Sequence, residues 1–344
     1  MMKNMMNNKT LWLGNRKRRK RYILTALVLL LIVIALAAFM MIYGNTVYSP
    51  KTILEILRSD ETKGAAFTIK TLRLPRMIAA VFCGLAFGLA GNTFQKLLGN
   101  PLASPDIIGV TSGASVAAVF AILILKLSGS IVSLLAVLSG LIVSAAIYFL
   151  AHSDGFSNGK LILTGIGMQA FLNALISWML LKASEYDVAS ALRWLSGSLN
   201  SASMDEIPRL VIVVSLSSLA IFLLSNHLEI LELGEAHAKM LGLRITLVRL
   251  SLILCALLLI AFATSVTGPI ASVAFLAGPI ATRISGAGKS NLLTSALTGS
   301  VLVMASDMIG QYAFPTRYPV GVITGILGAP YLIYLLIRIN RTKE

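Results

Sequence analysis

The chain has 344 residues, of which 57% are hydrophobic and only 12% are charged, and its mean hydropathy is +0.85. This composition excludes an ordinary soluble globular protein, because one core of this size needs far less apolar surface. The net charge of +15 could suit a nucleic-acid partner, but six basic residues form a single block, 16–21, directly before the first apolar segment. Such a block is typical of a topology signal, so no nucleic-acid partner is predicted.

Apolar segments recur along the chain, and most are long enough to cross a hydrocarbon core of roughly 30 Å as helices. Ten spans are predicted near residues 22–43, 77–95, 107–126, 130–151, 161–182, 208–225, 247–266, 269–285, 292–312 and 319–338. The expected fold class is therefore all-α and integral to a lipid bilayer.

The distribution of basic residues predicts the orientation of these spans. Ten crossings return the chain to the side of the 16–21 block, where Arg283, Lys289, Arg338 and Lys343 then also fall. Because basic loops stay in the cytoplasm, both termini are predicted to be cytoplasmic. The expected organisation is a basic segment at 1–21, one transmembrane domain at 22–338 and a short tail at 339–344.

Glycines at one-turn spacing predict where helices approach each other closely. The pairs are Gly84/Gly88, Gly109/Gly113 and Gly321/Gly325. Small residues let helix backbones meet where lipid offers no hydrophobic drive for association. Packing within one subunit is favoured over a contact between subunits.

Two features inside the spans predict the translocation pathway. The span at 269–285 is interrupted by Gly268-Pro269 and by Gly278-Pro279, and irregular backbone at membrane depth needs shelter from protein or water. Asp307 is the main ionisable group within the spans, where an unpaired charge costs on the order of 3 kcal/mol. Gly278, Pro279 and Asp307 are thus pathway candidates. For Asp307, structural pairing is favoured over a proton relay, because a relay usually shows several buried titratable groups.

The chain shows no pattern of an enzyme or of a metal site. The string at 286–290 ends like a phosphate-binding loop, but Arg283 stands where that motif needs its first glycine. The histidines and cysteines lack metal-ligand spacing and are expected to be loop and packing residues; they are His152, His227, His237, Cys83 and Cys255. No cofactor is predicted in this chain.

The loop at 227–249, expected on the cytoplasmic side, contains a predicted short amphipathic helix. Glu235 near its start and Lys239 four residues later suit a favourable i,i+4 pair, and Gly242 can close the helix. The pattern fits a helix offered to a partner protein, although a plain surface loop is open on the same residues.

Basic residues also stand at the opposite, external side. Arg73 and Arg76 close the segment that leads into the second span, and Arg317 precedes the last one. They fit either interfacial anchoring by long side chains or docking of an acidic protein.

Four strings in order resemble the FecCD-type permease family of ABC importers, which carry iron-siderophores or cobalamin. The strings are Arg73-Leu-Pro-Arg76, the segment Gly-Asn-Thr-Phe-Gln-Lys-Leu-Leu-Gly-Asn-Pro-Leu-Ala-Ser-Pro-Asp-Ile-Ile-Gly at 91–109, Leu233 through Gly242, and Pro319 through Pro330. The resemblance extends over nearly the whole chain after Tyr43. It implies a ten-transmembrane-helix permease of the type II importers, similar to the cobalamin permease.

The resemblance also implies roles for single residues. A cytoplasmic coupling helix that contacts an ATPase subunit would include Leu233, Gly234, Glu235, Ala238, Leu241 and Gly242. Docking of an extracytoplasmic substrate-binding protein would use Arg73, Arg76 and Arg317. Many relatives have histidine or glutamine after the proline at 279, whereas this chain has Ile280, which favours a different permease chain over a second copy as its partner.

The predicted function is therefore the permease subunit of an ATP-driven importer in a bacterial cytoplasmic membrane. It would move an Fe(III)-siderophore, with haem or cobalamin as the alternative cargo, and would hydrolyse no ATP itself. ATP and Mg²⁺ would bind a dimeric ATPase partner. An ion-driven secondary transporter, and a channel or membrane scaffold, are the alternatives of another class; the former should show intramembrane ion ligands.

Overall fold

The computed structural model describes residues 2–58, 64–151, 158–286 and 290–341, and the regular elements within these ranges are all helices. In chain order they are α1 (Met2–Ile42), α2 (Pro50–Arg58), η1 (Phe67–Arg73), α3 (Leu74–Leu97), η2 (Pro105–Ile108), α4 (Val110–Leu123), α5 (Ser130–Ala151), α6 (Asn158–Lys182), α7 (Glu185–Leu195), η3 (Leu199–Ser201), α8 (Ile207–Leu223), α9 (Ser225–Glu232), α10 (Glu235–Met240), α11 (Ile245–Thr267), α12 (Val273–Ser285), α13 (Leu292–Tyr312) and α14 (Val320–Arg341). The predicted all-α class is confirmed. His152, Lys289 and Lys343 lie outside the described residues.

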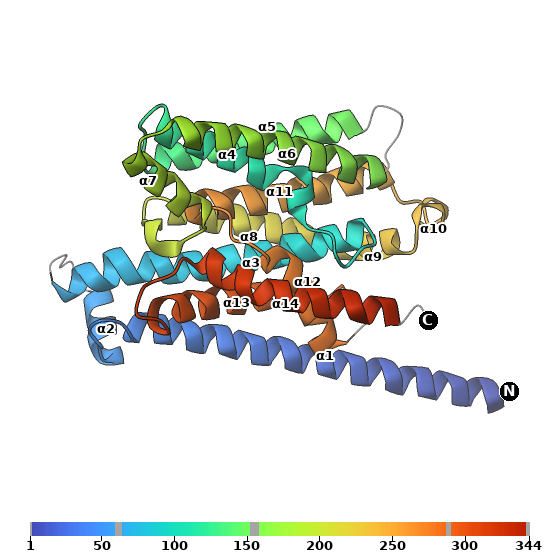
Figure 1. Ribbon diagram of the computed structural model, residues 1–344. Helices are drawn as coiled ribbons and strands as arrows, with labels where there is room; N and C mark the ends of the chain where they lie inside the picture. The colour runs from blue at the N-terminus through green and yellow to red at the C-terminus, as the bar shows by residue number, and fades with distance from the viewer. Residues whose placement is uncertain (1, 59–63, 152–157, 287–289, 342–344) are drawn as a thin grey trace.

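The long helices lie side by side in one bundle (Figure 1). We call the end at which α1 begins and α14 finishes the terminal end, and the end that carries α2 and α7 the distal end. The short helices α9 and α10 lie at the terminal end (Figure 1). The predicted loop helix and both chain ends therefore share one end of the bundle.

Within the described ranges, six helical segments are long and apolar enough to cross a membrane: 16–42, 67–97, 130–151, 159–182, 245–267 and 292–312. α8 and α9 pass the same test together, but they are bent by 54° relative to each other. The shorter apolar helices are α4, α12 and residues 320–335 of α14. Each predicted span coincides with one of these elements. The number of ten crossings stays a prediction, because three of the helices are shorter than a full span.

The predicted break at Gly268-Pro269 is confirmed, since α11 ends at Thr267 and α12 begins only at Val273. The intervening backbone is sheltered by protein. The N–H of Ser198 donates to the carbonyl of Thr267 at 2.6 Å, and a Cβ atom on Gly197 would lie 2.3 Å from the carbonyl oxygen of Pro269. Irregular backbone at membrane depth is stable where neighbouring segments supply its hydrogen bonds.

The second predicted break, at Gly278-Pro279, is wrong. α12 continues through Pro279 to Ser285. A proline has no N–H, so the carbonyl of Phe275, four residues earlier, loses its helical partner. The side-chain amide of Gln95 on α3 donates to this carbonyl at 2.9 Å and so replaces the missing bond. A long-range side chain therefore keeps the helix intact.

α3 is the central helix of the bundle. The apolar window of 67–97 is 72% buried, against 28% for that of α1, so α3 is an interior helix and α1 a peripheral one. α3 crosses α13 at very short range. A Cβ atom on Gly299 would lie 2.2 Å from the carbonyl oxygen of Gly84, and one on Gly88 would lie 2.2 Å from that of Ser295. The predicted close packing at Gly84/Gly88 is confirmed as a contact within the chain.

This crossing leads to a test of stability. We expect Gly299→Ala to destabilise the protein by about 2 kcal/mol, because the added methyl group forces two backbones apart. Gly325→Ala is the matched control, since its Cβ would meet only the methyl of Ala271 at 4.0 Å. The measurement is thermal unfolding of the purified protein in detergent. Equal unfolding temperatures for the two variants would contradict the importance of the α3–α13 approach.

Candidate functional site

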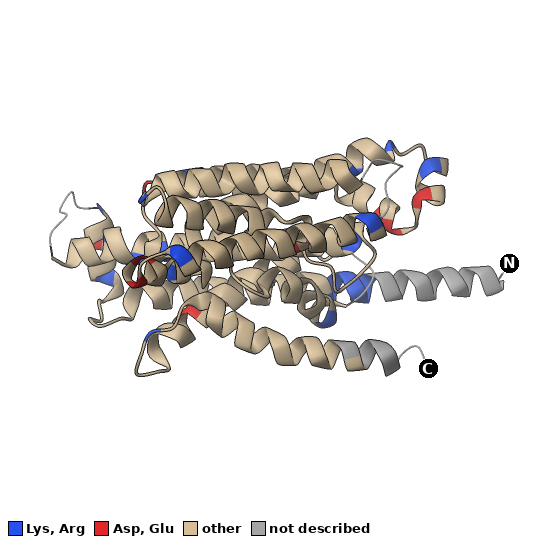
Figure 2. Cartoon of the chain, turned by 45° about the horizontal axis from the view of Figure 1, so that its top comes forward, with Lys and Arg blue, Asp and Glu red and all other residues tan. Residues whose placement is uncertain are grey.

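Among the described residues, the charged ones lie mostly at the two ends of the bundle and few lie along its middle (Figure 2). This is the distribution expected when a lipid bilayer surrounds the middle of the bundle. The candidate site residues fall into a distal group around Arg76, a terminal group around α10, and the pair Gly278–Pro279 in α12.

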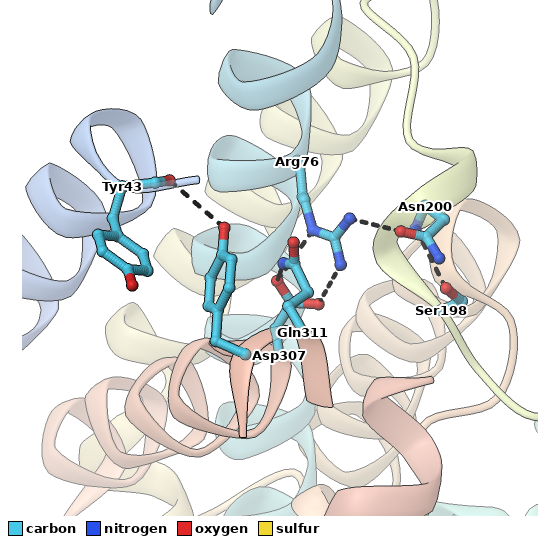
Figure 3. Close-up of polar contacts among 7 residues, drawn as sticks. Tyr43, Arg76, Ser198, Asn200, Asp307 and Gln311 are labelled. Carbon is cyan, nitrogen blue, oxygen red and sulfur yellow. Dashed lines mark hydrogen bonds and ion pairs between the residues drawn. The ribbon is translucent and has the colours of Figure 1, made fainter. Parts of the chain in front are cut away.

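In the distal group, Arg76 at the start of α3 reaches Asp307 on α13 (Figure 3). The Arg76 guanidinium donates through Nε to Oδ2 at 2.9 Å and through Nη2 to Oδ1 at 2.7 Å. Gln311, one turn further along α13, donates to Oδ2 at 2.7 Å. The remaining Nη1 of Arg76 donates to the side-chain oxygen of Asn200. Both carboxylate oxygens of Asp307 are thus satisfied.

The burial of this group decides its energetic role. The Asp307 side chain is 2% exposed and that of Arg76 is 19% exposed. A charge so deeply buried needs a partner, and removing one member of a buried pair is strongly destabilising. The expected structural pairing of Asp307 is confirmed, whereas a pathway role for Asp307 stays a prediction.

Arg73, one turn before Arg76, caps the end of α1. Its Nη1 donates to the carbonyls of Met41 at 2.7 Å and Ile42 at 3.0 Å, and its Nη2 donates to that of Thr46 at 2.5 Å. The carbonyls at the end of a helix lack N–H partners from within the helix, so this guanidinium replaces them. The hydroxyl of Tyr312 on α13 donates to the carbonyl of Tyr43 at 3.3 Å nearby (Figure 3).

Arg317 differs from the other two distal arginines because its side chain is exposed. Its Nη2 donates to the side-chain oxygen of Asn45 at 3.0 Å, in the same turn after α1 that Arg73 holds. Arg73 and Arg317 thus both contact the turn after α1, whereas Arg76 contacts Asp307 and Asn200. Arg73 and Arg76 hold the fold together, while Arg317 also offers surface to solvent. Their docking role stays a prediction.

At the terminal end, Gly242 closes α10 as expected. Its φ is +75°, and it donates its N–H to the carbonyl of Lys239 at 3.0 Å, while Leu243 donates to that of Ala238 at 3.0 Å. These two bonds form a Schellman motif, which needs a residue at positive φ and so favours glycine. Ala238 is fully buried against the bundle.

Three large apolar side chains of this loop are exposed to solvent. Leu233 is 61% exposed, Met240 is 84% exposed and Leu241 is 64% exposed. Gly234, with a φ of +96°, separates α9 from α10 and lets the chain turn between them. Three large apolar side chains on one short exposed segment are unusual for a solvated loop, and they are the type of surface that a partner protein covers.

The prediction that Glu235 pairs mainly with Lys239 is wrong. Glu235 forms an ion pair with Arg249 on α11, whereas Lys239 contributes only a weaker attraction. The hydrogen bond from Arg249 holds the pKa of the Glu235 carboxyl below its usual range, so Glu235 is ionised at neutral pH. The contact attaches α10 to a long membrane helix, which local spacing could not reveal.

Gly278 and Pro279 lie far from the distal group. A Cβ atom on Gly278 would lie 2.0 Å from the side-chain oxygen of Gln95, so this glycine makes room for the amide that binds Phe275. Gln95 and Arg76 stand 19 residues apart on α3, a distance of about 28 Å along a helix. The structure therefore does not bring Asp307 and Gly278 into one site.

The exposed side of α6 carries small and polar residues that were not among the predicted site residues. Only 22% of this helix's apolar window is buried, and Gly167, Ala170, Asn173 and Ser177 are exposed there among large apolar side chains. An asparagine amide is poorly tolerated against lipid. The repeat of small and polar residues every three or four positions within an apolar span was the available signal, and it points to a face covered by protein or water.

The Arg76–Asp307 pair can be tested by substitution. We expect Arg76→Met to destabilise the protein by about 3 kcal/mol, because it leaves a buried carboxylate without its main partner. Lys126→Met is the control. It removes an exposed pair with Asp187, which has 2.5 Å between Nζ and Oδ2, and should change the stability little because water screens the two charges. Thermal unfolding in detergent measures both. An Arg76→Met protein as stable as the control would contradict a structural role.

Comparison with known proteins agrees with this architecture. A model of the FecCD transport family matches residues 24–338. The ferric enterobactin transport system permease protein FepG of Escherichia coli (strain K12) is 34% identical over 325 residues, which are 94% of this chain and 98% of FepG. The vitamin B12 import system permease protein BtuC of Vibrio vulnificus (strain CMCP6) is 32% identical and covers 93% of this chain and 95% of its own length.

A solved structure described as an inward-facing conformation of a metal-chelate type ABC transporter has the same fold. It matches with a TM-score of 0.82 at 24% identity, over 92% of this chain and 100% of the other. With a family match over most of its length and relatives above 30% identity across nearly all of theirs, the chain belongs to the FecCD transport family.

Proposed function

We propose that the chain is the membrane permease subunit of an ATP-driven importer that carries an Fe(III)-siderophore into the cell. The observation that carries this proposal is α10, a short helix held on the bundle by Ala238 and Glu235 while Leu233, Met240 and Leu241 are exposed. Such a helix suits a cytosolic partner that moves it. The relatives support the cargo class, since FepG is named for ferric enterobactin transport and BtuC for vitamin B12 import.

The partner at α10 is an ATPase dimer that holds ATP and Mg²⁺, and this chain contributes no catalytic group to hydrolysis. A polar chelate cannot cross lipid unaided, and its uphill movement needs a source of free energy. Hydrolysis at the partner supplies that energy. The chain converts it into a change of access from one side of the membrane to the other.

A second permease subunit covers the exposed side of α6 that carries Asn173. The Ser177 hydroxyl already donates to the carbonyl of Asn173 at 3.0 Å. The side-chain amide of Asn173 would otherwise face lipid, while a neighbouring subunit or a water-filled pathway between two subunits would satisfy it. Ile280, which follows Pro279, favours a different permease chain over a second copy. The chelate passes along the junction of the two subunits.

Both termini and α10 face the cytoplasm of a bacterial cell, and the distal end faces outward. The basic block 16–21 supports this orientation, and Arg283 lies beside it, because Arg21 donates to the carbonyl of Arg283 at 3.0 Å. A substrate-binding protein docks at the distal end, where Arg317 is exposed. Complementary charge there mainly sets orientation and encounter rate.

Other cargo and another class of transporter are weaker alternatives. Haem or cobalamin would need the same machinery, and BtuC keeps cobalamin in consideration. An ion-driven secondary transporter would rely on an ionisable group at membrane depth, but both oxygens of Asp307 are engaged by Arg76 and Gln311.

The decisive experiment is uptake by the complete transporter in proteoliposomes, with iron-labelled siderophores, haem and labelled cobalamin offered in turn. We expect ATP-dependent uptake of a ferric siderophore. Glu235→Arg should lower uptake and stimulation of the partner ATPase at least about tenfold, because it places a second positive charge next to that of Arg249. The same reversal at the exposed Glu55 of α2 is the control. Accumulation by this chain alone under an ion gradient would refute the proposal.

Docking is tested separately by the affinity of the substrate-binding protein. We expect Arg317→Glu to weaken binding about tenfold at low salt and to reduce its dependence on salt, because an exposed charge that meets an opposite charge is screened by ions. Lys182→Glu, also exposed and at the end of α6, is the control. An affinity for Arg317→Glu that matches the control at both salt concentrations would reject this surface.

A further inference from the structure

Three glutamates that precede or begin α10 are spaced by three residues, and each contacts a different part of the bundle. Glu229 Oε1 accepts from the backbone N–H of Ser290 at 3.0 Å. Glu232 Oε1 pairs with Lys96 Nζ at 2.6 Å. Glu235 pairs with Arg249. The segment 229–235 is therefore attached to the loop before α13, to the end of α3 and to α11.

The end of α3 contacts Ser290 as well, and also α12, through buried amides. Asn92 donates to the carbonyl of Ser290 at 2.8 Å, and Gln95 donates to that of Phe275 at 2.9 Å. Asn92 is 3% exposed and Gln95 is 6% exposed. Ser290 is thus held from both sides, by Glu229 through its N–H and by Asn92 through its carbonyl. Three side chains within five residues of α3 contact α9, α12 and the start of α13.

These contacts connect α9 and α10 to the membrane helices α3 and α12, whereas the chain connection from α8 to α9 does so only through a bend. The 54° bend between α8 and α9 means that α9 is not a rigid extension of α8. The buried hydrogen bonds of Asn92 and Gln95 fix the end of α3 relative to Ser290 and to Phe275. A displacement of α9 and α10 must therefore either move the end of α3 together with α12, or break the Lys96–Glu232 pair.

We propose that Lys96 is a positioning residue for transport, and that its ion pair with Glu232 passes the movement of α10 to α12 and α13 through Gln95 and Asn92. The proposal rests on the function proposed above, in which an ATPase acts on α10. Lys96 contacts neither cargo nor nucleotide in this arrangement. Its side chain is 14% exposed and that of Glu232 is 35% exposed, so the pair is partly shielded from water and from salt.

The test is the ratio of ferric siderophore taken up to ATP hydrolysed in the reconstituted complete transporter. Lys96→Met and Glu232→Gln should each lower this ratio about fivefold or more while the ATPase still assembles and hydrolyses ATP. The exchanged pair, Lys96→Glu with Glu232→Lys, should recover the ratio to within about twofold of the original. Lys126→Met, which removes the distal pair with Asp187, is the matched control.

A second measurement does not depend on transport. Amide hydrogen exchange in the purified chain should become faster in α12 and at residues 290–295 in Lys96→Met, but not in α7. Unchanged exchange there would overturn the proposal, as would a normal uptake ratio in both single variants. If the original transporter fails to take up a ferric siderophore at all, the proposed function is wrong, and the exchange data still report whether Lys96 connects α9 to α12.

Discussion

Carbonyl groups at helix ends and at helix breaks are the constraint on which this structure depends. Lipid cannot hydrate them, so each needs a donor from elsewhere in the chain. Gln95 supplies the donor that Pro279 removes from α12, and Arg73 supplies three for the end of α1 and the turn after it. At the end of α12, Arg21 donates to the carbonyls of Ile284 at 2.9 Å and of Arg283 at 3.0 Å. These polar side chains donate hydrogen bonds to backbone carbonyls that have no partner within their own helix.

α3 organises the bundle because it carries such groups at both ends and glycines between them. Its first turn holds Asp307 through Arg76, its middle approaches α13 at Gly84 and Gly88, and its last turns hold α12 and α9. A central helix with this pattern is well placed to connect events at the two surfaces of a membrane. The distal contacts are buried and charged, whereas the terminal contacts reach a segment bent away from its preceding helix.

The functional proposal follows from surfaces that the fold leaves uncovered. α10 and the residues beside it expose Leu233, Met240 and Leu241, and α6 exposes the amide of Asn173 within an apolar span. The apolar surface at α10 is unfavourable in water, and the polar group on α6 is unfavourable in lipid. A protein neighbour that covers each surface would remove the cost. A permease that works between an ATPase and a second membrane subunit has such neighbours at both places.

The sequence alone determined the positions of the apolar segments, the closure of α10 at Gly242 and the requirement for a partner at Asp307. These features depend on local periodicity, on a single backbone angle and on the cost of a charge in lipid, all of which are read within a few residues. The strings at 73–76, 91–109, 233–242 and 319–330 also indicated the family correctly.

Only the tertiary structure decided which residues meet. Arg76 and Asp307 are 231 positions apart, and Gln95 and Phe275 are 180 positions apart. Such pairs depend on how the helices pack. Predictions from local spacing were therefore wrong in two places: the break of α12 at Pro279 and the pairing of Glu235 with Lys239. The exposed face of α6 was undetermined for the same reason, since the side of a helix that is left uncovered is known only when its neighbours are in place.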